Sequence, residues 1–100
     1  MEVIIMYILY GSANIYLPYS SSLKDKRKII QSIIARIRKR FNISIAEVEF
    51  NDLRQRGKLG FAAVAASYGE AELFLTSIKE VLDLHLDDIE ITDFDYKILS

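Results

Sequence analysis

The sequence contains no cysteine, which excludes disulfide bonds, thiolate nucleophiles and cysteine metal sites. This absence also fits a reducing compartment. The single histidine, His85, lies near the end of the second predicted helix, where we expect it at the surface or beside the last helix carbonyls. No serine lies in a nucleophile-elbow pattern, and no glycine-rich phosphate-binding pattern is present. We therefore nominate no catalytic residue and expect no cofactor, and an enzyme stays open only as a third alternative.

Long apolar runs are also missing. The run at 3–9 is the only candidate for a targeting segment, but it has no basic residue before it and is far shorter than the ~20 residues that a membrane helix needs. We interpret it as a buried strand and expect a cytoplasmic protein with no membrane partner. With 100 residues, 51% of them apolar and 27% charged, the chain fits one globular domain over residues 1–100.

The first strand pattern covers 3–17, where the odd positions carry no charged or strongly polar side chain. A period of two predicts that these odd positions face the core. Because the pattern is longer than a usual strand, we expect a bulge or bend near Gly11 and Ser12.

A helix is predicted over 23–40, with Ser22 as its N-cap and Asp25 completing a capping box. Its apolar residues recur every three or four positions and form one stripe: Leu23, Ile30, Ile33, Ile34, Ile37 and Phe41. Further patterns predict strands at 43–50, 58–66 and 89–98 and a second helix at 69–86.

The resulting order, β-α-β-β-α-β, is the signature of a split βαβ fold. Right-handed crossovers then place both helices on one face of a four-stranded antiparallel sheet. We therefore predict an α+β two-layer sandwich.

The sheet face without helices is predicted to be apolar at one end. Four residues of the first strand point there: Ile4, Met6, Ile8 and Tyr10. An exposed patch of this kind is uncommon on a monomer and favours a homodimer interface or a ligand surface. The alternative is that a bulge turns part of the strand over, or that other side chains cover the patch.

Charge is unevenly distributed along the chain. Residues 20–58 carry eleven Lys or Arg and four Asp or Glu, while the rest of the chain carries two basic and ten acidic residues. Opposite the apolar stripe of the first helix, four cations predict an exposed basic ridge suited to phosphate backbones: Lys24, Lys28, Arg36 and Lys39. The alternative is a solvated helix face that acids of the second helix balance.

The start of the first helix is unusually basic. Cations there oppose the helix dipole by roughly 0.3–1 kcal/mol each, yet four crowd the first turns: Lys24, Lys26, Arg27 and Lys28. Together with backbone N–H groups and serine hydroxyls they predict an anion site. Arg54 and Arg56, in the connection at 51–57, are suited to bidentate anion contacts, although the connection is equally well explained as a constrained hairpin.

An acidic run at 87–95 closes the sequence. It lacks the spacing of a calcium-binding loop, so we interpret it as a solvated edge strand and expect no metal site.

Two segments carry a family resemblance. The segment SLKDKRK at 22–28, after IYLP at 15–18, and the segment FNISIAEV at 41–48, followed by Asp52-Leu53, Gln55-Arg56 and Leu59-Gly60, resemble the bacterial YlxP-like family. Arg54 departs from the family pattern, which usually shows an aromatic there. The resemblance implies a ferredoxin-like fold, no established activity, and, from gene neighbourhoods rich in translation functions, an RNA or ribosome partner.

Two functions remain open at this point. The first is a non-enzymatic module that contacts RNA or the ribosome through the basic ridge with Arg54 and Arg56. The second is a self-associating structural or ligand-sensing module that uses the apolar end of the open sheet face.

Overall fold

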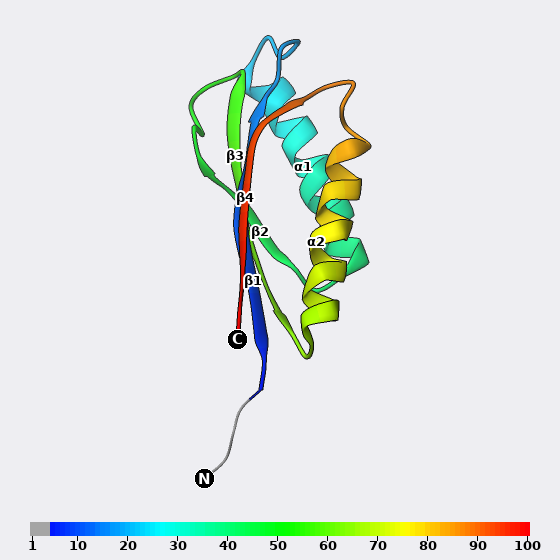
Figure 1. Ribbon diagram of the computed structural model, residues 1–100. Helices are drawn as coiled ribbons and strands as arrows, with labels where there is room; N and C mark the ends of the chain where they lie inside the picture. The colour runs from blue at the N-terminus through cyan, green and yellow to red at the C-terminus, as the bar shows by residue number, and fades with distance from the viewer. Residues whose placement is uncertain (1–4) are drawn as a thin grey trace.

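The computed structural model describes residues 5–100 and contains four strands and two helices. The elements in chain order are β1 (Tyr7–Tyr16), α1 (Leu23–Arg40), β2 (Ser44–Glu49), β3 (Arg56–Ala65), α2 (Tyr68–Asp83) and β4 (Glu90–Leu99). The strands form one antiparallel sheet in the order β2-β3-β1-β4, and both helices cover the same face (Figure 1). The predicted two-layer sandwich is confirmed.

The core lies between the sheet and the helices. Odd residues of β1 such as Leu9, Ala13 and Ile15 are buried, as are Ile33 and Ile37 of the α1 stripe. The predicted core faces are therefore confirmed within these elements. The period of two continues after β1, where Leu17 is buried, but it fails before β1, where Ile5 is 72% exposed.

Helix α1 begins as predicted at Ser22, whose side chain accepts a hydrogen bond from the Asp25 backbone N–H at 3.1 Å. The return bond of the capping box is displaced by one residue. The Asp25 carboxylate accepts from the Ser21 backbone N–H at 3.2 Å and from the Ser21 hydroxyl at 2.7 Å. Of the orphan donors at this helix end, the Asp25 N–H is thus satisfied by a local side chain.

The predicted bulge at Gly11 and Ser12 is wrong. The pairing of β1 with β3 is continuous, and the shift lies in the pairing with β4, between Asn14 and Ile15. There β4 has one extra residue, Thr92, whose hydroxyl donates to the Asn14 carbonyl at 3.2 Å. Gly11 instead allows close approach of β4, because a Cβ at this position would collide with the Asp95 carbonyl oxygen.

Helix α2 ends at Asp83, three residues earlier than predicted, and His85 lies in the turns that follow. The imidazole is buried, so a surface position is wrong. Its Nδ1 lies 3.0 Å from the Val81 carbonyl oxygen and its Nε2 lies 3.3 Å from the Ser32 hydroxyl. Since a carbonyl only accepts, Nδ1 donates there, and the Ser32 hydroxyl donates to Nε2.

Candidate functional site

The outer face of α1 carries the basic ridge, by which we mean Lys24, Lys28, Arg36 and Lys39. All four residues are exposed, and Arg27 beside them is exposed too. Within residues 5–100 none of these five cations forms an ion pair. Acids of the second helix therefore do not balance the ridge.

Other cations of α1 are engaged within the fold. Arg38 donates to the Ile45 carbonyl at 3.1 Å, and Arg40 pairs with Glu80 of α2 at 2.7 Å. The difference between these residues and the ridge is one of helix face: Arg38 and Arg40 reach neighbouring elements, whereas the ridge points away from the sheet.

Lys26 is a correction to the predicted set of anion-binding residues. Its side chain is completely buried, in the stripe that packs on the sheet. The ammonium group lies 2.8 Å from the Phe50 carbonyl oxygen, 3.4 Å from that of Asn51, 2.6 Å from that of Leu53 and 3.0 Å from that of Arg56. Lys26 is therefore unavailable to an external anion.

We call this arrangement the Lys26 cage, and Glu47 completes it. A Glu47 carboxylate oxygen lies 2.9 Å from the ammonium nitrogen. The same oxygen has no hydrogen bond among the described residues, so the angle at this contact is poor even though the distance is short. We regard the contact as an ion pair, because the attraction between charges depends on distance and hardly on that angle. An ammonium has three N–H donors, and here the four carbonyls share them.

The cage joins two segments that are far apart in the sequence. It ties the first turn of α1 to the connection between β2 and β3. Two further hydrogen bonds join this connection to the segment before α1: the Leu17 N–H donates to the Gln55 carbonyl at 2.9 Å, and the Gln55 side-chain amide donates to the Pro18 carbonyl at 3.3 Å. Figure 1 shows this connection and the start of α1 at the same end of the molecule. The two segments that carry the family resemblance meet here.

Of the two arginines in this connection, the structure places only Arg54 clear of the sheet, where it is exposed. Arg56 is the first residue of β3, and its side chain lies on the sheet face opposite α1, because the next residue, Gly57, packs against Ile30 of α1. The Arg56 guanidinium lies 4.2 Å from the centre of the Phe50 ring. Grouping Arg56 with the ridge is therefore wrong.

Side chains of the chain itself occupy part of the predicted anion site at the start of α1. Its serine hydroxyls are already used, since that of Ser22 accepts from Asp25 and that of Ser21 donates to the Asp25 carboxylate. The side-chain and backbone hydrogen bonds from Ser21 lower the pKa of Asp25 below its ordinary value. The helix end thus holds a carboxylate of its own chain where an external anion was expected.

The sheet face away from the helices, called the open face here, has the predicted apolar end. Met6 is 44% exposed, Tyr10 is 42% exposed and Ile8 is half-buried. Ile4 lies outside the described residues. Sequence reasoning missed two exposed residues that extend the patch: Val64, paired with Ile8 on β3, and Leu99, paired with Ile8 on β4.

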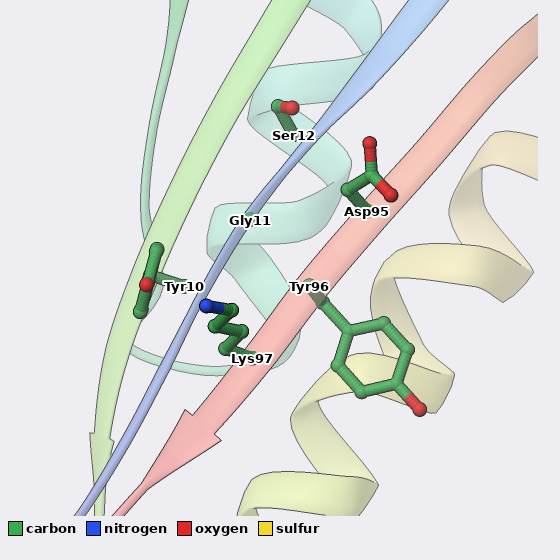
Figure 2. Close-up of a pocket in the computed structure, with 6 residues that line it drawn as sticks. All are labelled: Tyr10, Gly11, Ser12, Asp95, Tyr96 and Lys97. Atoms are coloured by element: carbon green, nitrogen blue, oxygen red, sulfur yellow. The ribbon is translucent and has the colours of Figure 1, made fainter.

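A shallow hollow of about 320 Å³ lies on the open face over Gly11. Figure 2 shows Tyr10, Ser12, Asp95 and Lys97 around it, while the ring of Tyr96 turns toward α2. Ser12 and Asp95 in its lining are paired across β1 and β4, and no hydrogen bond joins their side chains in the described part of the chain. Over residues 5–100, no group of three or more His, Asp or Glu side chains is placed to hold a metal ion.

The comparisons with known proteins match this geometry. A family model described as "Protein of unknown function (DUF503)" matches residues 8–96. The chain belongs to the DUF503 family. A relative of this DUF503 chain is the uncharacterized protein YlxP of Bacillus subtilis (strain 168), which is 36% identical over 64 residues, 64% of this chain and 70% of that protein. The predicted YlxP-like membership is confirmed.

Solved structures similar to this DUF503 chain show the ferredoxin-like fold alone. A dimeric ferredoxin-like protein of unknown function from Thermobifida fusca matches with a TM-score of 0.56 and 7% identity, over 95% of this chain and 91% of that chain. The de novo designed protein Foldit4 matches with a TM-score of 0.61 and 8% identity, over 96% and 98%. In the described part of the DUF503 chain, neither helix is long and apolar enough to cross a bilayer.

Proposed function

We propose that this DUF503 protein binds RNA through the basic ridge of α1. One observation carries the proposal: four cations stand exposed on one helix face with no ion-pair partner among residues 5–100. Lys24 and Lys39 are fifteen residues apart, which corresponds to about 22 Å along a helix. This length matches several consecutive phosphates of one strand.

The contacts would position phosphates and read no bases. Between the cations, the same helix face carries Gln31, Ser32 and Ala35, and none of these offers an aromatic surface for stacking. Sequence-specific RNA recognition relies on stacking and on contacts to base edges. Binding through the ridge is therefore expected to be sequence-tolerant and strongly dependent on salt.

The rest of the helix layer confines RNA to α1. Helix α2 exposes Glu70, Glu72, Glu80 and Asp83, and its single cation, Lys79, lies over the rings of Phe94 and Tyr96. A polyanion is repelled by this surface, so its contacts would end where α2 begins.

The test is fluorescence anisotropy with a labelled structured RNA over a series of salt concentrations. The wild type should bind with a log–log salt slope of about −3 to −4, since each neutralised phosphate contributes about 0.7 to 0.9. Replacing all four ridge cations with glutamine should remove most of the affinity and flatten the slope.

A matched control separates the ridge from net charge. The double variants K24Q/K28Q and R36Q/K39Q each remove two positive charges from the ridge, and K79Q/K97Q removes two from α2 and β4. Each ridge variant removes about two phosphate contacts, so the magnitude of its salt slope should fall by roughly 1.4 to 1.8. The control should change the slope little. Equal effects of all three double variants would contradict binding at the ridge.

A further inference from the structure

The open face carries one column of side chains on each strand, and the three columns on β3, β1 and β4 hold its charge pattern, with β2 at the outer edge beside β3. The central column, on β1, is uncharged and consists of Ile8, Tyr10, Ser12, Asn14 and Tyr16. The column on β3 begins with two cations, and the column on β4 begins with acidic residues. The pairing places Arg56 and Glu90 on either side of Tyr16, and Lys58 and Asp93 on either side of Asn14.

These opposite charges are not partners within one chain. Strand β1 separates β3 from β4, so the two columns stand about 10 Å apart. Within residues 5–100, no ion pair joins them, and Lys58 has only a 3.5 Å contact with Glu49, whose carboxylate is mostly exposed. Arg56 lies over the Phe50 ring, which leaves the edge of its guanidinium available to a carboxylate.

The other end of the same face is apolar. Val64 is 64% exposed and Leu99 is 48% exposed, and they flank Ile8 from β3 and β4. Tyr10 and Met6 continue this surface. An apolar area of this kind with charged residues beside it is typical of a protein–protein interface.

The three columns are complementary to themselves. A two-fold rotation about an axis along β1 lays the central column on its own copy and exchanges the β3 and β4 columns at the same level. Arg56 then faces Glu90 of the second copy, Lys58 faces Asp93, and Val64 faces Leu99. We propose that the open face binds a second copy of this chain, sheet against sheet, about this axis.

The size of the face suits a modest dimer. Three strands of ten residues cover about 34 by 14 Å, or roughly 1,000 Å² over both copies, which is near the lower limit for a specific interface. Packed sheets keep their strands within about 30° of each other, and the long Arg, Lys and Glu side chains span the resulting offset between rows. The charged rows are therefore expected to decide whether the dimer forms.

The test exchanges the charges of one column at a time. In a homodimer of the first variant, R56E/K58E, the two new carboxylates of each copy face Glu90 and Asp93 of the other. In a homodimer of the second variant, E90K/D93K, the two new cations of each copy face Arg56 and Lys58 of the other. Each variant alone should raise the dimer dissociation constant at least about tenfold, measured by sedimentation velocity. In an equimolar mixture the charges are again opposite in both halves of the interface, so a heterodimer of wild-type strength should form, detected by energy transfer between labelled chains.

A wild type that stays monomeric at high protein concentration would overturn the proposal. A mixture that stays monomeric would also overturn it, provided that circular dichroism shows both variants to be folded. If either double variant fails to fold, the single exchanges K58E and D93K replace it. A ligand or another protein as the occupant would leave the wild type monomeric. The ridge variant K24Q/K28Q should remain dimeric, which separates this result from the RNA experiment.

Discussion

At the scale of single residues, Lys26 is the centre of a buried cluster of polar contacts. A buried ammonium is costly unless its donors are matched, and here four carbonyls and Glu47 surround it. One of these carbonyls belongs to Phe50, whose φ of 67° is unusual for any residue but glycine. Lys26 therefore holds a strained turn in place, and with it the start of β3.

The change Lys26→Met keeps the length of the side chain and removes its charge. It leaves a partly buried Glu47 without its cation and removes the ammonium donor from the four carbonyls, so the free energy of unfolding should fall by about 3–5 kcal/mol. The exposed neighbour Lys24→Met is the control and should change it by less than about 0.5 kcal/mol. Urea unfolding of both variants measures the difference, and equal effects would contradict the cage.

The position of Lys26 was partly readable from the sequence. In the predicted stripe, Leu23 and Ile30 are seven residues apart, and Lys26 fills the empty place between them at the helical spacing. Because Lys26 is charged, the sequence favours an exposed position for its side chain, but in the structure this side chain is buried. The reason could not be found in the sequence pattern, because its main partners are backbone carbonyls that carry no side-chain signal.

At the scale of secondary-structure elements, local sequence signals predicted the start of helix α1 correctly and the position of the β-bulge incorrectly. Ser22 and the period of the stripe located α1 correctly, since caps and periodicity act within a few residues. The bulge was placed at Gly11 because that residue is local to β1. Its true position depends on Thr92 of β4, nearly eighty residues away in sequence, and such a register is decided by the partner strand.

The start of α1 makes a prediction about pH. Hydrogen bonds from Ser21 lower the pKa of Asp25, so its ionised form stabilises the fold above its ordinary pKa of 3.8, and this contribution is lost as the pH falls through the lowered value. Asp25→Asn should therefore destabilise the protein at pH 7 and have a smaller effect near pH 2. Urea unfolding of both proteins at the two pH values measures this. An effect of Asp25→Asn that stays constant with pH would contradict the role of the charge.

At the scale of the whole molecule, the uneven charge of the sequence separates into three surfaces. The excess of cations in residues 20–58 becomes the ridge on the helix layer and the basic column on the open face. The acids of the last strand become the opposing column. The sequence left open that acids of the second helix balance the basic ridge, but Arg40 with Glu80 is the one ion pair between α1 and α2 in the described residues. The charge patterns therefore face outward.

A dimer built through the open face would have four layers, with the helices outside and the two ridges facing opposite directions. One short RNA hairpin should then reach only one ridge, so dimerisation should leave the affinity per chain unchanged. The variants R56E/K58E and E90K/D93K test this, because each should be monomeric alone and the two should dimerise when mixed. The mixture and the separate samples contain the same chains, so their total charge is the same. Anisotropy of the mixture with a labelled hairpin should equal the value expected for independent sites. Binding about tenfold tighter in the mixture would show that two ridges hold one RNA, and it would contradict this arrangement of the layers.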